Sequence, residues 1–203
     1  MYASPAKYVA QTSSIRRPLL MWLCAAAGSV FLFSLIIGAP LALDTGHPFL
    51  GLTLYRAFSF VCHQIPERSF FIAGHQFAVC SRCTGLYAGF TAATILYPLC
   101  RSLRRTEAPA RKWLFLAAAP LAIDFTLGYL GIWENTHWSR FATGALLAVV
   151  SVFYVMPGLM ELSLRDWHDK QEPVNATPLS TAPMFPPNVS AAPSDYSAPH
   201  RRI

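Results

Sequence analysis

The feature that most constrains this chain is a run of about 25 residues, 19–43, that contains no charged side chain. A helix of that length crosses roughly 30 Å of hydrocarbon with some tilt. Arg16, Arg17 and Pro18 stand directly before the run. Only 13% of the 203 residues are charged, whereas a soluble domain carries about 25%. These observations predict an integral membrane protein.

Three further apolar runs predict three more transmembrane helices, over about 77–99, 113–132 and 140–160. Residues 44–76 are too broken by polar and turn residues to cross a bilayer, and they favour a short interfacial or re-entrant helix. The loop 133–139 holds two tryptophans, which is typical of the headgroup region. The predicted fold class is therefore an all-α membrane protein with a four-helix membrane domain over 19–165.

The two ends of the chain are predicted to lie outside the membrane domain. Residues 1–18 are predicted to form a cytoplasmic N-terminal segment. Residues 166–203 are rich in Pro, Ser and Ala without a periodic pattern, so a disordered tail is expected. No cleavable signal peptide is evident, because the first apolar run is too long for a signal sequence and lacks a small-residue cleavage site.

The net charge of +6 indicates membrane orientation rather than nucleic-acid binding, since the basic residues flank the apolar runs. Lys7, Arg16 and Arg17 precede the first run. A second basic group occupies the loop between the second and third runs: Arg101, Arg104, Arg105, Arg111 and Lys112. The chain is expected in the inner membrane of the cell. By the positive-inside rule both of its termini are expected in the cytoplasm. Residues 44–76 and 133–139 are then expected on the outer side.

A cysteine- and histidine-bearing segment lies within residues 55–90. Cys62 and His63 are adjacent, and Cys80 and Cys83 form a C-x-x-C pair. Zinc sites in proteins use four nitrogen or sulfur ligands, often in two closely spaced pairs. These four residues are therefore the predicted metal ligands, with zinc as the favoured ion. Two adjacent residues can hold one ion only from a bent backbone, and His75 is an alternative fourth ligand.

Two other interpretations of the same cysteines stay open. A C-x-x-C at a helix N-terminus, with Arg82 inside it, favours reactive thiols, and an outward-facing site would lie in an oxidising compartment. A disulfide that only clamps the loop is the second alternative. Cys24 and Cys100 lie within or at the end of apolar runs and are expected to act as small apolar residues.

Charged and small residues supply three further hypotheses. Asp124 lies in the third run, where a carboxylate is usually paired or functional, and a contact with Arg140 across the short outer loop is predicted. Gly85 and Gly89 form a G-x-x-x-G, which permits close approach of another helix. Arg68, which follows Glu67 in the loop, could join Arg82 in offsetting negative charge or holding an anionic ligand.

Two ordered strings of residues resemble a known family, the small prokaryotic membrane proteins catalogued as domain of unknown function 2085. The first string comprises Cys62-His63-Gln64, Pro66-Glu67-Arg68-Ser69-Phe70, Gly74 and Cys80-x-Arg82-Cys83-Thr84-Gly85-x-Tyr87-x-Gly89. The second comprises Asp124, Asn135, Arg140, Thr143 and Gly144, with Phe125 where the family often has Gly. The resemblance covers about residues 55–150. It implies a multi-span membrane protein in which the Cys/His segment and the group of Asp124, Asn135 and Arg140 act together. It implies no activity.

Three functions are compatible with the sequence. The first is a membrane protein that binds zinc through Cys62, His63, Cys80 and Cys83. The second is a membrane thiol-disulfide oxidoreductase that uses Cys80 and Cys83. The third is a structural or assembly subunit that contacts a membrane protein partner, or a second copy of itself, through the Gly85/Gly89 face. The remaining candidate functional residues are Gln64, Glu67, Arg68, Ser69, Arg82, Asp124, Asn135 and Arg140.

Overall fold

The computed structural model describes residues 15–164 as five helices with a short hairpin between the second and the third. The tail expected over 166–203 and most of the segment 1–18 lie outside the described residues. The elements follow the chain in this order: α1 (Arg16–Asp44), α2 (Pro48–Phe58), the 3-10 turn η1 (Pro66–Arg68), β1 (Phe71–Ile72), β2 (His75–Gln76), α3 (Ser81–Cys100), α4 (Lys112–Tyr129) and α5 (His137–Leu164).

Among the described residues, three helices are long and apolar enough to cross a membrane: α1, α3 and α5. The predicted spans at 19–43, 77–99 and 140–160 correspond to these helices, although α3 begins only at Ser81. The third predicted span forms a helix, α4, but α4 is not among the three. It has 18 residues and contains Lys112, Pro120 and Asp124. The structure therefore supports an all-α membrane protein with three candidate spans among the described residues.

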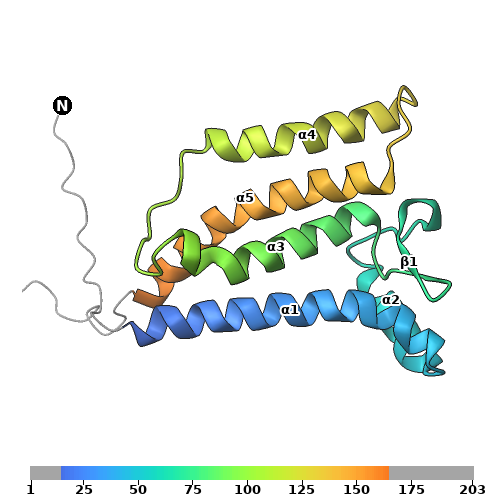
Figure 1. The fold of residues 1–203 in the computed structure, drawn as a ribbon, viewed down its shortest axis with the longest axis horizontal. Helices are drawn as coiled ribbons and strands as arrows, with labels where there is room; N and C mark the ends of the chain where they lie inside the picture. Colours follow the sequence, from blue (N-terminus) through green and yellow to red (C-terminus); the bar gives the residue numbers. More distant parts are fainter. Residues whose placement is uncertain (1–14, 165–203) are drawn as a thin grey trace, which may run out of the picture. The chain divides into compact units, whose positions relative to one another are not determined.

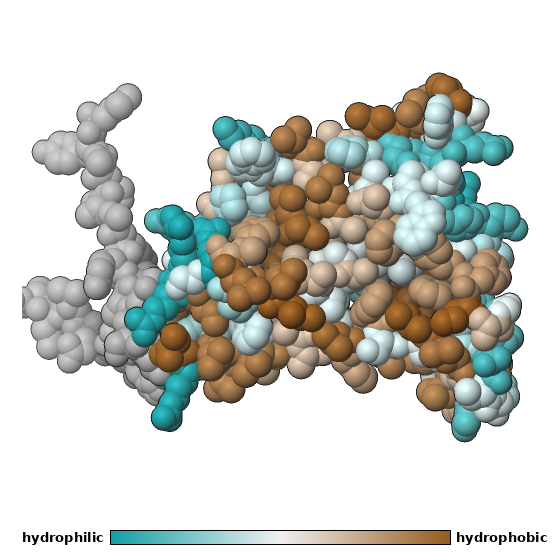
Figure 2. Space-filling view, viewed as in Figure 1, coloured by the Kyte–Doolittle hydropathy of each residue, from teal (hydrophilic) through white to brown (hydrophobic). Residues whose placement is uncertain are grey.

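The surface is consistent with a bilayer as solvent. Figure 2 shows apolar side chains over the middle of the visible face, while hydrophilic side chains gather toward its two ends. Several large apolar side chains on the long helices are exposed, including Phe31 at 62%, Phe115 at 72% and Leu116 at 63%. Such exposure of large apolar groups is costly in water and favourable in lipid.

The long helices lie side by side; α3 and α5 run in the same direction, and α1 and α4 run opposite to them (Figure 1). Helix α3 packs directly against α5 through glycines. A Cβ added at Gly85 would overlap the carbonyl oxygen of Phe141, and one added at Gly89 would lie 2.6 Å from that of Ala145. From the other side, a Cβ at Gly144 would overlap the carbonyl oxygen of Arg82. The predicted close approach at Gly85 and Gly89 is thus made within the chain, by α5 rather than by a partner protein.

Helix α1 joins this pair by packing and by polar contacts. Trp22 donates its indole N–H to the carbonyl oxygen of Thr94 at 2.8 Å, and the Thr91 hydroxyl donates to that of Ser29 at 3.2 Å. Two buried clusters result, one at each end of the bundle. The first contains Ile36, Ala39, Phe58, Cys62, Ala78 and Val79. The second contains Ala93, Tyr97, Val152, Met156 and Met160.

The segment between α1 and α3 folds back over one end of the bundle. Helix α2 confirms the short helix expected in residues 44–76; Pro48 opens it, and Gly46 has a positive φ of 77° in the preceding turn. The hairpin pairs Phe71 with Gln76 and Ile72 with His75. Its two-residue turn, Ala73–Gly74, has positive φ at both positions, which matches the twist of a tight hairpin.

Candidate functional site

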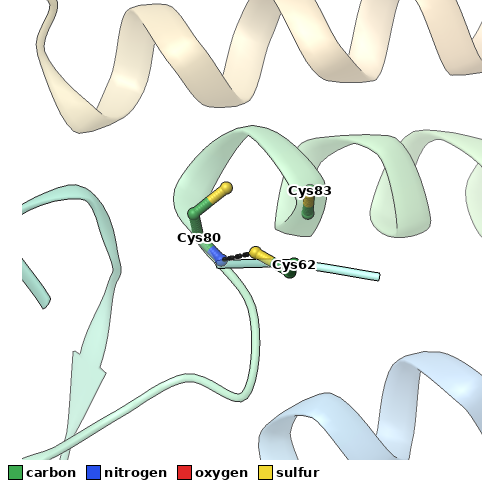
Figure 3. Close-up of side chains that lie close together, drawn as sticks. All are labelled: Cys62, Cys80 and Cys83. Atoms are coloured by element: carbon green, nitrogen blue, oxygen red, sulfur yellow. Dashed lines mark hydrogen bonds between the residues drawn. The ribbon is translucent and has the colours of Figure 1, made fainter. Parts of the chain in front are cut away.

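Three cysteines from two separate segments converge where α3 begins. The Sγ atoms of Cys62, Cys80 and Cys83 all lie within 4.8 Å of one another. Cys80 is the residue just before α3, Cys83 lies in its first turn, and Cys62 reaches them from the segment after α2 (Figure 3). All five cysteines of the chain are free thiols. The three that converge could hold a metal ion.

Hydrogen bonds bind the three thiols to one another. The backbone N–H of Cys80 donates to Cys62 Sγ at 3.2 Å (Figure 3). Hydrogen bonds from the thiol of Cys62, and then from that of Cys83, lower the pKa of the Cys80 thiol far below its usual range. Backbone N–H groups of Cys83 and Arg82 act in the same direction, as expected at the start of a helix. These contacts thus favour the thiolate form of Cys80, and thiolate is the form in which cysteine binds metal.

A single glutamine holds the Cys62 segment in place. Gln64 has a positive φ of 52°, which is uncommon for a residue with a side chain. Its amide nitrogen donates to the carbonyl oxygens of Tyr55 and Ala78, each at 2.7 Å. These bonds connect the end of α2 to the extended segment that leads into Cys80. The backbone bend after Cys62 is therefore fixed by side-chain hydrogen bonds.

Two buried serines hold the loop from the other side. The Ser69 hydroxyl donates to the carbonyl oxygen of Ile65 at 2.8 Å, and the Ser81 hydroxyl donates to that of Arg68 at 2.5 Å. Both side chains are almost fully buried. Because Ser81 is the first residue of α3, its bond places Arg68 beside the cysteines.

An ion pair connects α3 to α4 next to the thiols. Arg82 donates to the carboxylate of Asp124, and the two side chains are only 20% and 11% exposed. The Arg82 guanidinium also lies over the ring of Phe125, 5.5 Å from its centroid. Asn135 donates from its amide to the carbonyl oxygen of Asp124, so the loop after α4 is anchored to the same group.

A cavity of about 350 Å³ opens beside these residues. Its polar lining combines the three cysteines with three arginines. The lining residues are Val61, Cys62, His63, Gln64, Ile65, Arg68, Cys80, Arg82, Cys83, Leu86, Phe125, Gly128, Tyr129, Asn135 and Arg140. Two buried polar atoms here have no hydrogen-bond partner, Arg82 Nε and Asn135 Oδ1. We call this space the arginine cavity.

The structure brings most of the predicted site residues together, but not all of them. His63 lines the cavity and is exposed, yet it does not belong to the group of three cysteines. His75 lies in β2 and lines neither the cavity nor the cysteine group. Glu67 is exposed outside the cavity, and Ser69 supports the loop from within.

The predicted partner of Asp124 was wrong. The ion pair of Asp124 is made with Arg82 and not with Arg140. Arg140 still lies within the electrostatic influence of Asp124 and of the two other arginines of the cavity. The reason is the position of α3, which packs against α5 and carries Arg82 in its first turn, so that the long Arg82 side chain reaches the carboxylate on α4.

Several residues that shape the site carried no clear sequence signal. Val61, Ile65, Leu86 and Tyr129 line the cavity as apolar or aromatic walls, and Phe125 covers Arg82. Apolar residues are frequent throughout this chain, so their positions in the wall depend on helix rotation. At position 128 the wall requires a glycine, because a Cβ there would lie 2.7 Å from the amide nitrogen of Asn135.

Together these features define a helical membrane protein with a thiol cluster and an arginine-lined cavity at one end of its bundle. The family described as "Predicted membrane protein (DUF2085)" matches residues 62–154, which includes the cysteines, Asp124 and Arg140. The chain belongs to this family.

Two archaeal relatives are similar to part of the chain, and both are described as uncharacterized. The protein of Methanocaldococcus jannaschii is 40% identical over 114 residues, which cover 56% of this chain and 73% of the relative. The protein of Methanothermobacter thermautotrophicus is 41% identical over 88 residues, 43% of this chain and 77% of the relative. No solved structure is significantly similar to the chain.

Proposed function

We propose that this protein binds one zinc ion through Cys62, Cys80 and Cys83. The observation that carries the proposal is the convergence of the three Sγ atoms to within 4.8 Å of one another. Tetrahedral zinc with Zn–S bonds of 2.3 Å holds its sulfurs about 3.8 Å apart, so small side-chain rotations would complete the geometry. Three soft sulfur ligands favour zinc over magnesium or calcium.

The fourth ligand position is proposed to face the arginine cavity. His63 follows Cys62 and lines that cavity, so a rotation of its side chain could supply a nitrogen ligand. A water molecule or a small ligand entering from the cavity could occupy the same position. Zinc sites with three protein ligands and one open position are the reactive type, whereas sites with four protein ligands are structural.

The membrane topology is proposed to comprise four spans with the zinc site on the outer side of the inner membrane. Helix α4 lies alongside α5 and runs opposite to it (Figure 1), as a fourth span would. The basic loop 101–112 lies at the end of the bundle where α1 begins (Figure 1), and the positive-inside rule assigns that end to the cytoplasm.

Introduced cysteines test this orientation. Glu107 and Glu134 are exposed residues of the loops at opposite ends of α4. Beyond the labelling of the native cysteines, measured on the unsubstituted chain, a membrane-impermeant maleimide is expected to label Glu134→Cys in intact spheroplasts and to label Glu107→Cys only after lysis. The reverse pattern would overturn the orientation, and labelling of both from one side would exclude α4 as a span.

A thiol-disulfide oxidoreductase is the second candidate, favoured by the same proximity of Cys80 and Cys83 at the start of a helix. Oxidation of this pair to a disulfide would transfer two electrons and two protons to a disulfide of a substrate protein, which becomes two thiols, and Cys62 is close enough to exchange with either sulfur.

Metal content and thiol count separate the two candidates. The chain is purified without added metal, and zinc is measured beside the number of thiols that react before and after chelation. One zinc per chain, with three further thiols exposed by the chelator, supports the zinc site. Absence of zinc together with a reducible Cys80–Cys83 disulfide supports the oxidoreductase and contradicts the zinc proposal.

A further inference from the structure

A second cavity lies farther along the bundle, between α1, α3 and α5. Its volume is about 610 Å³, and its walls are mostly apolar; Gly28, Leu32, Phe90 and Leu147 are among them. Ligand pockets of small molecules have volumes of roughly 300–1,000 Å³. We call this space the apolar cavity. All three helices that surround it are candidate membrane spans, so it lies at the depth of hydrocarbon.

The two cavities adjoin each other. Val61, Cys83 and Leu86 line both of them. A molecule that occupied both spaces would place its polar end beside the arginines and its apolar end among the membrane spans, and it would pass the Cys83 side chain. The combined space has the polarity of an amphiphile.

The arginine cavity has more positive than negative charge. Arg68, Arg82 and Arg140 line it, and no acidic residue does so among the residues that the structure describes. Asp124 pairs with Arg82 and so offsets one of the three charges. Three thiolates around a zinc ion would offset a second. The three guanidinium groups share one cavity, and the repulsion among like charges in a partly enclosed space is relieved by a bound anion.

Two buried polar atoms without hydrogen-bond partners also favour an anionic ligand. Arg82 Nε is a buried donor without an acceptor, and unsatisfied buried polar groups are rare and costly. Guanidinium groups form their strongest hydrogen bonds with carboxylates and phosphates. The neighbouring Asn135 Oδ1, a buried acceptor without a donor, would suit a hydroxyl group on the same headgroup.

We propose that the two cavities together bind one membrane lipid with an anionic headgroup. Arg68 and Arg140 hold the headgroup, and one hydrocarbon chain lies between α1, α3 and α5. The apolar cavity favours a lipid over a free anion, because a free phosphate would leave it without an apolar occupant. This inference goes beyond the zinc site and does not depend on it, since it rests on the arginines and on the two cavities.

The headgroup half of the proposal is tested with dioleoylphosphatidic acid as the probe. The purified full chain, in nanodiscs of dioleoylphosphatidylcholine, is titrated with the probe and bound lipid is counted by native mass spectrometry. One phosphatidic acid per chain is expected. Arg68→Gln and Arg140→Gln should each weaken its binding on the order of tenfold, as for loss of a charge-assisted hydrogen bond. Arg56→Gln is the matched control, because Arg56 lies over Phe60 and lines neither cavity.

The hydrocarbon half is tested with two glycines of α1. Gly28 lines the apolar cavity and Gly38 does not, and a Cβ at either position meets no atom within 4 Å. Gly28→Phe should weaken phosphatidic acid binding on the order of tenfold, while Gly38→Phe leaves it unchanged. Gly28→Leu is the milder variant if Gly28→Phe does not purify as a monodisperse protein.

Three outcomes would overturn the proposal. The first is equal binding of phosphatidic acid by wild type, Arg68→Gln and Arg140→Gln. The second is phosphatidic acid binding that stays unchanged when Gly28→Phe fills the apolar cavity. The third is binding of glycerol 3-phosphate as tight as that of the lipid, which would make the site one for a free anion. Zinc is measured in the same samples, so that loss of metal and loss of lipid binding are recorded separately.

Discussion

The two ends of the helix bundle contain the same kinds of residue in different surroundings. At the end where α3 begins, which we call the cysteine end, three arginines and three cysteines line one cavity. The other end carries the basic loop 101–112. There Arg105 and Glu107 form an ion pair 3.7 Å apart, and their side chains are 63% and 79% exposed. Cys100 is also exposed there. Water screens charges in the basic loop, whereas burial at the cysteine end makes Arg82 and Asp124 each require a partner.

The comparison separates two uses of arginine in one membrane protein. A solvated cluster sets orientation through its number of charges, and the position of each residue matters little. An enclosed cluster depends on individual geometry, as the pair of Arg82 with Asp124 shows. Substitutions at the cysteine end should therefore have large effects, and matched substitutions at the basic loop should have small ones.

The largest effect is expected for Cys80→Ser, measured against Cys100→Ser. Structural zinc contributes about 10–16 kcal/mol over four ligands, so losing one thiolate should weaken zinc binding on the order of a hundredfold. Cys100 has no part in the cysteine group, and its replacement should leave zinc affinity unchanged. Competition with a chromophoric chelator measures both. Equal affinities in the two variants would remove Cys80 from the site.

A comparable effect, on folding stability rather than on zinc affinity, is expected for Asp124→Asn, measured against Glu107→Gln. Removal of one partner from a largely buried ion pair costs about 3 kcal/mol, whereas loss of an exposed pair costs less than about 1 kcal/mol. Thermal unfolding in detergent reports the difference. The double variant Arg82→Gln/Asp124→Asn should be more stable than Asp124→Asn alone, because no unpaired guanidinium is left. A double variant that is less stable would contradict the pairing.

The smallest effect is expected for Gly144→Leu, measured against Gly158→Leu in the same helix. A side chain at position 144 meets the backbone of Arg82, whereas one at position 158 meets nothing within 4 Å. Overpacking should cost about 2 kcal/mol at Gly144, while the control should gain up to about 1 kcal/mol from helix propensity. If both variants unfold at the same temperature, close packing of α3 on α5 does not support the cysteine end.

Much of the fold was predictable because bilayer thickness fixes the length of an apolar helix. The run 19–43 became α1, and Gly85 and Gly89 contact another helix as their spacing indicated. The hairpin at residues 71–76 was not foreseen, because its strands are two residues long and leave no alternating pattern. The status of α4 as a span stays a prediction, since Lys112 and Asp124 reduce its apolar character.

The site was predictable in its residues and less so in its contacts. The C-x-x-C spacing and Cys62 indicated a cluster, which the structure forms. His63 lies outside it because side chains of adjacent residues in a non-helical segment point in different directions; Cys62 is buried and His63 exposed. The pairing of Asp124 with Arg82 depends on the rotation of α3 and α4 about their axes, which sequence spacing does not give.

The central claim, that Cys62, Cys80 and Cys83 hold zinc, is tested most directly by X-ray absorption at the zinc edge on the purified chain. The account predicts one zinc per chain with three sulfur neighbours at about 2.3 Å and one lighter ligand at about 2.0–2.1 Å. A spectrum with only nitrogen and oxygen neighbours, or a protein that does not retain zinc at all, would contradict it.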